Sequence, residues 1–420
     1  MPGQTPNSLG LPTALSSHAY KVFRRGTHRV RDPDETLARV RLCADKMGIT
    51  RIGNVTGLDR IGIPVAIAVR PNSRSLAVSQ GKGLSLAQAM ASALMEATEL
   101  YHGEDIFTRT KSLRYAELTA KTAAVSPTLL AGTGTPLPED TELPWIEGYD
   151  LLREQSCWVP WEVVHTDYTL SSAHSGKYFL SGSNGMGAGN HLLEALSAAI
   201  CEVIERDAVA LWSASGLAQR AARRLDMASV NDADCLLLLE KYAKARVLPR
   251  VWDVTSEIGV PVFICDLTAE VDYGPSGLRR FRGAGCHPNR AVALARALTE
   301  AAQIRLTYVT GNRDDLNPSD YEETPQEKLG AALLDAASHA AVPRSFLAAP
   351  SFDADDVADD VSWLLDRLRS AGMSRVVAVD LTRNDLGIPV ARVIIPGLEW
   401  NCTHPDYVPG PRARRLGSAP

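Results

Sequence analysis

Paired glutamates at helical spacing are the most chemically informative feature of the sequence. Glu96 and Glu99 lie in the segment SALMEATE, one turn after Ser92, and Glu202 and Glu205 repeat the spacing in EVIERD. Residues three or four positions apart share one face of a helix. A carboxylate held against apolar neighbours is costly unless a cation or a donor meets it. The pairs therefore favour a metal ion or a basic ligand, although the first pair alone fits a solvent-facing acidic stripe equally well.

A third segment and a glycine-rich loop extend this pattern. The segment ALTEAAQIR adds Glu300, Gln303 and Arg305, and the loop SNGMGAGN contains Ser183 and Asn184. Carboxylates suit Mg²⁺, which leaves part of its coordination shell to substrate phosphates. The loop offers backbone N–H groups close to a helix start, where phosphate binds well. It is neither a P-loop nor a strict GxGxxG fingerprint. The segments predict a magnesium and phosphate site of another kind.

Basic side chains are available to neutralise phosphate charge. Arg206 and Arg305 follow the acidic segments, and arginine binds phosphate bidentately. A basic cluster surrounds the motif GTHR and consists of Lys21, Arg24, Arg25 and Arg29. This cluster could clamp a triphosphate, but a solvated basic face is the simpler interpretation. His287 could transfer protons, but we expect a packed loop histidine.

The acidic residues lie in three alanine- and leucine-rich segments whose spacing predicts helices. These segments run over residues 85–101, 191–212 and 290–308, and each follows a glycine-bearing loop. Each loop places glycines just before the helix, in the motifs GKG, SNGMGAGN and GAGCHP. We expect three similar units, each with an acidic helix.

A second set of repeats predicts β-hairpins. The three segments are VTGLDRIGIPV (55–65), DVTSEIGVPV (253–262) and DLTRNDLGIPV (380–390). In each, a polar turn with an acidic residue and glycine precedes an apolar-Pro-Val strand start. The alternative is that glycine and proline simply mark unrelated turns. The expected fold class is α+β: antiparallel sheets packed with long alanine-rich helices, in pseudo-repeated hairpin and acidic-helix units around a cleft, rather than a doubly wound sheet.

The length and the composition shifts predict the domain organisation. We expect one internally repeated domain over residues 18–410, with connections near 121–144 and 312–350, where proline, glycine and polar residues gather. Residues 1–17 and 411–420 are expected to form a flexible N-terminal tail and a partly exposed C-terminal tail.

Composition excludes several classes of protein. Of the 420 residues, 45% are hydrophobic and 22% are charged, which is typical of a globular protein. The net charge of −5 gives no basic excess for nucleic acid. No segment offers the ~18 apolar residues of a membrane span, and no signal peptide is visible. Seven scattered cysteines without a CxxC pair argue against disulfides and structural zinc. We expect a cytoplasmic protein.

With these motifs in view, the chain resembles the YcaO family of ATP-dependent enzymes that activate peptide backbone amides. The resemblance rests on GTHR with Lys21, on SALMEATE, on SNGMGAGN leading to EVIERD, and on GAGCHP leading to ALTEAAQIR. It implies that acidic helices hold Mg²⁺ ions, which bind ATP in a cleft without a P-loop. The implied metal ligands are Glu96, Glu99, Glu202, Glu205 and Glu300. The implied nucleotide contacts are Lys21, Arg29, Ser92, Ser183, Asn184, Arg206, Gln303 and Arg305.

Two departures from the family pattern bear on function. Leu100 follows Glu99 where the family often has arginine, and the C-terminus reads PRARRLGSAP instead of the proline-rich PxPxP tail of azoline-forming members. That ending, with SALMEATELYH and PDYVPGPRA, is similar to the branch that works beside TfuA-like proteins and is linked to thioamide formation.

The resemblance implies a reaction and a set of partners. A peptide amide oxygen attacks the γ-phosphate of ATP, and a sulfur nucleophile then displaces phosphate to leave a thioamide. The implied partners are a peptide or protein substrate, a TfuA-like protein and sulfide or a sulfur carrier, and the family is compatible with a homodimer. Two alternatives remain: an azoline-forming cyclodehydratase, and a non-catalytic ATP-binding accessory or scaffold protein.

Overall fold

The computed structural model describes residues 10–106, 108–169, 177–269, 280–313 and 315–417. All three repeated turn segments form antiparallel hairpins, as the sequence predicts. The pairs are β1 (Arg51–Asn54) with β2 (Val65–Val69), β9 (Val247–Asp253) with β10 (Val262–Ala269), and β13 (Val377–Asp380) with β14 (Val390–Ile394).

The three turns share one hydrogen-bond pattern. Asn54 Oδ1 accepts from the Thr56 N–H (3.0 Å), and Thr56 Oγ1 accepts from the Val65 N–H (3.0 Å). The same two bonds recur at Asp253, Thr255 and Val262 and at Asp380, Thr382 and Val390. The turn glycines, Gly62, Gly259 and Gly387, all have φ between 62° and 75°, which favours glycine. Local side-chain chemistry therefore fixes the hairpins.

Each hairpin gains a third strand and a long helix. The strands and helices are β3 (Val78–Lys82) with α3 (Leu86–Glu104), β11 (Phe281–Cys286) with α8 (Arg290–Thr310), and β7 (Met186–Ala188) with α5 (Leu192–Ala214). The predicted helices are thus confirmed to within a few residues. In the unit of α5, the strand and helix precede their hairpin in the sequence.

Glycine lets each helix lie directly against its strand. A Cβ at Gly81 would lie 2.0 Å from the Ala93 nitrogen, and one at Gly187 would lie 2.3 Å from the Ala195 oxygen. A Cβ at Gly283 would lie 2.2 Å from the Ala301 nitrogen. None of these three distances is possible between non-bonded atoms, so these positions require glycine. The GKG and GAG motifs are therefore packing signals.

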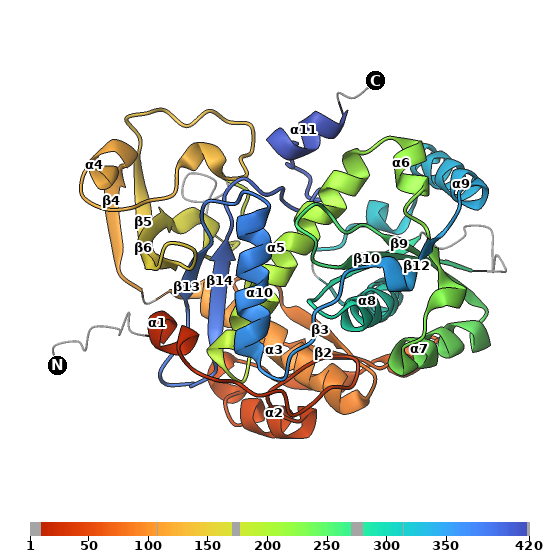
Figure 1. Cartoon of the computed structure of the whole chain (residues 1–420). Coiled ribbons are helices and arrows are strands. Elements are labelled where there is room, and N and C mark those ends of the chain that lie inside the picture. The colour runs from red at the N-terminus through yellow and green to blue at the C-terminus, as the bar shows by residue number, and fades with distance from the viewer. Residues whose placement is uncertain (1–9, 107, 170–176, 270–279, 314, 418–420) are drawn as a thin grey trace.

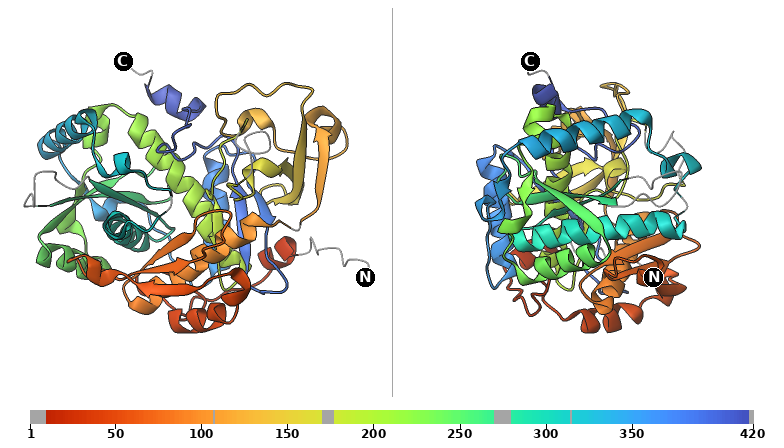
Figure 2. Two further views of the ribbon diagram at one scale, coloured as in Figure 1. Left: turned by 180° about the vertical axis from the view of Figure 1, so that it is seen from behind. Right: turned by 90° about the vertical axis from the view of Figure 1, so that its right-hand side faces the viewer.

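The remaining elements enlarge this framework (Figures 1 and 2). A six-stranded sheet runs β4-β5-β13-β14-β7, with β6 paired to β5. Helix α10 packs on α5, and Leu364 and Leu368 join Leu196 and Ile200 in one core. The other elements are α1 (Gly10–Leu15), α2 (Pro33–Arg41), β4 (Thr110–Arg114), α4 (Tyr115–Thr119), β5 (Glu142–Asp150), β6 (Gln155–Pro160), α6 (Leu217–Ala221), β8 (Leu225–Asp226), α7 (Ala233–Lys244), α9 (Pro325–Ala340), β12 (Arg344–Ser345), α10 (Val357–Ser370) and α11 (Pro411–Gly417). The α+β class is confirmed.

The predicted tails need correction where the structure describes them. Helix α1 buries Leu11 and Ala14 in the core, so residues 10–15 are not a flexible tail. The C-terminal tail is partly exposed at Pro411, Arg414 and Arg415, as predicted, but it forms helix α11 and is docked, because Arg412 makes a buried ion pair with Asp207 (2.8 Å) and Ala413 is 2% exposed. Residues 1–9 and 418–420 lie outside the described residues.

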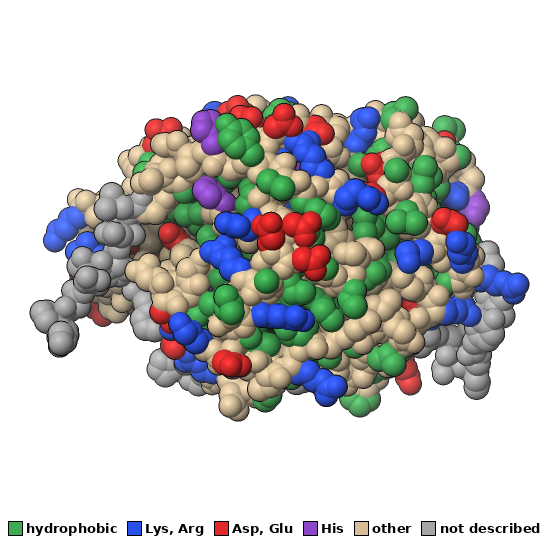
Figure 3. Space-filling model, turned by 90° about the horizontal axis from the view of Figure 1, so that it is seen from below, with side chains coloured by type: hydrophobic (Ala, Val, Ile, Leu, Met, Phe, Trp, Pro, Cys, Tyr) green, Lys and Arg blue, Asp and Glu red, His purple; other side chains and the backbone are tan. Residues whose placement is uncertain are grey.

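Two further observations concern the hydropathy of the helices and the charge of the surface. None of the helices in the described ranges is both long and apolar enough to cross a membrane. Figure 3 shows acidic and basic side chains interspersed on the face seen from below, in keeping with the net charge of −5.

Candidate active site

The three long helices meet at one cavity of about 640 Å³. Helices α3, α5 and α8 each contribute predicted site residues to its wall. The predicted residues that line it are Arg29, Ser92, Glu96, Glu99, Ser183, Glu202, Glu205, Arg206, Glu300 and Gln303. The structure thus brings all five predicted metal ligands together.

Backbone donors on the strands hold several of the acidic side chains. The Gln80 N–H donates to Glu96 Oε2 at 3.0 Å, and the Ala188 N–H donates to Glu99 Oε1 at 2.7 Å. The Ala284 N–H donates to Glu300 Oε1 at 3.4 Å. These bonds orient the carboxylates. Gln80 and Ala284 lie on the strands that pack on α3 and α8, whereas Ala188 lies on β7, the strand that packs on α5.

The third helix does not repeat the glutamate pair of the first two. The contacts of Gly81, Gly187 and Gly283 align Ala93 with Ala199 and Ala301. In this alignment Glu96 and Glu99 match Glu202 and Glu205, whereas α8 carries Ile304 and Thr307 at those positions. Glu300 instead matches Ser92, one turn earlier. The cavity is therefore lined by two glutamate pairs at equivalent helix positions. Its fifth glutamate, Glu300, stands at the position that corresponds to Ser92.

Burial and neighbouring negative charges shift the pKa values of the acidic side chains. Burial, followed by the charge of Glu202, raises the pKa of Glu99 well above its usual value, and burial raises the pKa of Glu96 to about 7. Burial and the neighbouring Glu300 raise the pKa of Glu205 to about 7. Glu300 differs: burial opposes ionisation, but Lys82 and then Arg206 hold its pKa below the usual value. Such a cluster favours a bound cation.

Cations surround the carboxylates. Arg206 lies 3.5 Å from Glu202, and Lys82 lies 2.6 Å from Glu300. Lys82 and Arg296 line the cavity, and sequence reasoning missed both. Arg296 stands one turn before Glu300 on the same helical face, and Lys82 is the middle residue of GKG. Both signals were available in the sequence.

The donors in the cavity fit Mg²⁺ and a polyphosphate. Five carboxylates give the hard oxygen ligands that Mg²⁺ prefers. Two buried polar atoms on the wall, Arg296 Nε and Gln303 Oε1, have no hydrogen-bond partner among the described residues. In the described hydrogen bonds, the Arg29 guanidinium donates to one acceptor, the His28 carbonyl. Unpartnered buried groups of this kind are typical of a site that awaits a polar ligand.

Three predicted nucleotide contacts lie outside this cavity. The Lys21 ammonium is buried and binds Asp360 (2.8 Å) and the Ala354 carbonyl (2.8 Å). Arg305 forms an ion pair with Asp59 at 2.8 Å. Asn184 lines a separate cavity of about 40 Å³. The structure does not bring these three side chains to the carboxylates.

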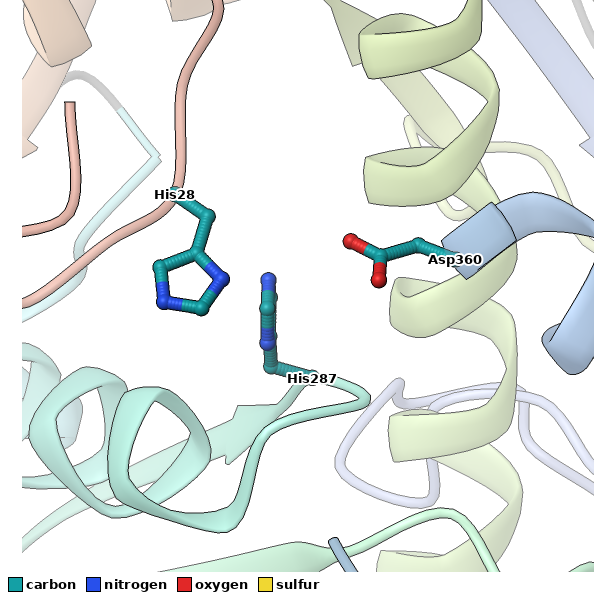
Figure 4. A group of neighbouring side chains, drawn as sticks. All are labelled: His28, His287 and Asp360. Carbon is teal, nitrogen blue, oxygen red and sulfur yellow. The ribbon is translucent and has the colours of Figure 1, made fainter. Parts of the chain in front are cut away.

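Lys21 belongs to a buried polar cluster behind the cleft. Figure 4 shows His28, His287 and Asp360, whose potential ligand atoms all lie within 4.8 Å of one another. His287 Nδ1 accepts the Asn289 N–H (3.0 Å), so its Nε2 carries the proton of the neutral ring. Asp360 already holds Lys21. Of the three groups only His28 has an unpartnered ring nitrogen, Nδ1, so the cluster lacks a complete set of free metal ligands. His287 is buried, as expected of a packed loop histidine.

Comparison with known proteins places the chain in a family. The model for the YcaO cyclodehydratase family, described as ATP- and Mg²⁺-binding, matches residues 80–399. A protein of the tfuA 3' region of Rhizobium leguminosarum bv. trifolii is 33% identical over 378 residues, 87% of each chain. A protein of Methanothermobacter thermautotrophicus is 33% identical over 401 residues, 92% of this chain and 98% of the relative.

Solved structures share the fold. YcaO from Methanopyrus kandleri, bound with AMPPCP and Mg²⁺, has a TM-score of 0.71 at 23% identity, with 91% of this chain and 95% of that chain covered. A heterocyclase in complex with substrate and cofactor has a TM-score of 0.77 at 23% identity, with 91% of this chain covered, and this chain spans about half of it (54%). The match to the family model and to the two relatives shows that the chain belongs to the YcaO family, whose cofactors are ATP and Mg²⁺.

Proposed function

We propose that this protein uses ATP and Mg²⁺ to phosphorylate a peptide backbone amide on oxygen, and that a sulfur nucleophile then converts the amide into a thioamide. The observation that carries the proposal is the convergence of Glu96, Glu99, Glu202, Glu205 and Glu300 on one cavity. Arginines and a glycine-bearing loop line the same cavity, as phosphoryl transfer requires.

The proposed steps balance without an added oxidant or reductant. The amide oxygen forms a bond to the γ-phosphorus of ATP, and ADP leaves with the bridging oxygen. Hydrosulfide adds to the activated carbon. The C–O bond then breaks, phosphate leaves with a proton, and a C=S bond remains. An amide oxygen is a weak nucleophile, so alignment and charge neutralisation should carry most of the rate.

Different residues of the cavity would bind the metal and the phosphates. Mg²⁺, when bound, neutralises phosphate charge and orients the transferring group. Glu96 and Glu99 from α3 and Glu202 and Glu205 from α5 would hold the metal. Glu300 would complete that ligand set from α8.

The cationic residues would meet the phosphates. Arg29, Arg206 and Arg296 line the same wall, and their guanidinium groups offer bidentate contacts. Ser92, Ser183 and Gln303 would supply neutral hydrogen bonds.

Thioamide formation is favoured over azoline formation by one observation: the relative from the tfuA 3' region matches most of this chain. Helix α11 is tied to α5 through Arg412 and Asp207, and Asn401 and Thr403 line the cavity. We propose a TfuA-like protein as partner.

The sulfur would come from outside the protein. All seven cysteines lie within the described ranges, and none lines the main cavity. Burial raises the pKa of Cys286, which opposes thiolate chemistry. Sulfide or a sulfur carrier is the proposed donor, and homodimerisation and a cytoplasmic location remain predictions.

An azoline-forming activity is the second candidate, because the similar heterocyclase shares the fold. A heavy-oxygen label placed in the peptide amide tests the activation step common to both products. We expect the label in the released inorganic phosphate, because the amide oxygen leaves bound to phosphorus. Labelled peptide that is modified while the phosphate stays unlabelled would contradict the proposal. ATP binding without peptide-dependent turnover would favour an accessory protein.

A further inference from the structure

One ion pair crosses the cleft between two units. Lys82 ends β3 in the unit of α3, and Glu300 lies on α8 of another unit. The Lys82 ammonium lies 2.6 Å from Glu300 Oε2. The two side chains are 19% and 18% exposed, and both line the cavity. The pair can therefore open into the cavity without unpacking the core.

Packing gives no reason for a lysine at this position. Lys82 follows Gly81, the glycine that lies against α3. The residues that follow Gly187 and Gly283, the matching glycines of the other units, are Ala188 and Ala284. Alanine thus satisfies the same strand-helix contact twice in this fold. The lysine side chain, which lines the cavity, therefore has a role in the cavity rather than in the packing of strand on helix.

The charges around Lys82 indicate the role of its side chain. Lys82 pairs with Glu300 at 2.6 Å, and Glu96 lines the same cavity, so the ammonium lies among the carboxylates of the site. Binding of an ammonium and a Mg²⁺ ion to the same carboxylate oxygen is unfavourable, because Mg²⁺ binds oxygen at ~2.1 Å and the two cations repel each other. A lysine on its flexible four-carbon stem can move away. The anions next to it would be the phosphates of the nucleotide.

We propose that Lys82 is an exchangeable cation of the active site: it compensates Glu300 in the nucleotide-free protein and moves to the ATP phosphates when Mg²⁺ takes that carboxylate. The inference rests on the proposed function, in which Mg²⁺ and ATP share this cleft. It makes Lys82 both a competitor of metal binding and a contact of the triphosphate. A purely structural ion pair would have neither property.

The test compares Lys82→Ala and Lys82→Arg with the wild type by calorimetry. Lys244→Ala is the matched control, because Lys244 pairs with Glu240 on the exposed face of α7. Mg²⁺ is titrated first without nucleotide, and ATP is titrated next in saturating Mg²⁺. We expect Lys82→Ala to bind Mg²⁺ alone at least as tightly as the wild type, and to bind ATP about tenfold more weakly, the value of one charge-assisted hydrogen bond. Lys82→Arg should restore most of the ATP affinity.

The opposite results separate the inference from the proposed function. Weaker binding of Mg²⁺ alone by Lys82→Ala, or unchanged ATP affinity in that variant, would overturn the inference and leave the proposed function standing. A wild-type protein that binds no ATP in saturating Mg²⁺ would overturn both. If Lys82→Ala does not fold, Lys82→Met keeps the stem of the side chain, and the same two titrations decide.

Discussion

The backbone N–H of Ala188 donates a 2.7 Å hydrogen bond to the carboxylate of Glu99. Ala188 ends β7, the strand packed on α5, whereas Glu99 belongs to α3. One proposed metal ligand of the first unit is thus oriented by the strand of another unit. The two glutamate pairs face one cavity because this bond and the glycine contacts fix α3 and α5 to the same strand.

The paired glutamates should control metal-dependent nucleotide binding. Glu202→Gln and Glu99→Gln each keep the side-chain volume and remove one anionic ligand, so we expect at least tenfold weaker Mg²⁺-ATP binding, about 1.4 kcal/mol, with folding intact. Calorimetry measures the affinity. Glu240→Gln on the exposed face of α7 is the matched control and should bind normally. If both cleft variants bound Mg²⁺-ATP with wild-type affinity, the assignment of these glutamates as metal ligands would be wrong.

Metal binding should depend on pH. Burial raises the pKa of Glu96 and Glu205 from 4.5 to about 7, so the folded protein holds these protons more tightly than the unfolded chain. Their contribution to stability is present at low pH and is lost as pH rises from 4.5 to about 7. Mg²⁺ needs the deprotonated acids and should compensate for that loss.

The checking measurement is the thermal midpoint with and without Mg²⁺ at about pH 6 and about pH 8. We expect the larger Mg²⁺-induced increase at the higher pH. Proton release on Mg²⁺ binding near neutral pH should also make the calorimetric enthalpy depend on the buffer. An equal increase at both pH values would show that these carboxyl groups do not bind the metal.

The glycine contacts should be essential for stability. Gly187→Ala places a Cβ 2.3 Å from the Ala195 oxygen, so strand and helix must separate, and we expect a loss of ~1–3 kcal/mol or more in the free energy of unfolding. Gly216→Ala is the control, because its φ is −61° and no atom lies within 4 Å of the new Cβ. Urea unfolding compares them. Equal stabilities would mean that the packing is looser than described.

The docked C-terminal helix should stabilise the catalytic helix α5. Arg412 meets Asp207 through two hydrogen bonds of 2.9 and 2.8 Å, and the Asp207 side chain is completely buried. Arg412→Ala leaves that charge without its partner, so we expect a loss of ~3–5 kcal/mol. The exposed Arg414→Ala should unfold like the wild type in the same urea titration. A small effect of Arg412→Ala would indicate that α11 detaches easily.

Sequence reasoning predicted what local chemistry determines. The three hairpins follow from an Asn or Asp, a Thr and a Gly placed within one turn, and the helices follow from apolar spacing. The glutamate pairs could be placed on helix faces for the same reason. That the pairs meet at one site was a hypothesis from their residue types and from the family resemblance, because nothing local shows that β7 pairs with β14.

Some predicted nucleotide contacts have protein partners that are distant in the sequence. Lys21, a predicted phosphate contact, holds Asp360 in this structure, 339 residues away. Arg305 is similarly held by Asp59, 246 residues away. The C-terminal segment has the composition of a tail and yet docks on Asp207, 205 residues away. Spacing along one helix contains no information about such partners.

The most direct test of the central claim is the intact mass of a peptide after reaction. The protein is incubated with ATP, Mg²⁺, sulfide, a TfuA-like partner and the peptide encoded beside its gene. Replacement of one amide oxygen by sulfur predicts a gain of about 16 Da that requires both ATP and sulfide. A loss of about 18 Da without sulfide, the mass of water, would contradict thioamide formation and identify an azoline-forming enzyme.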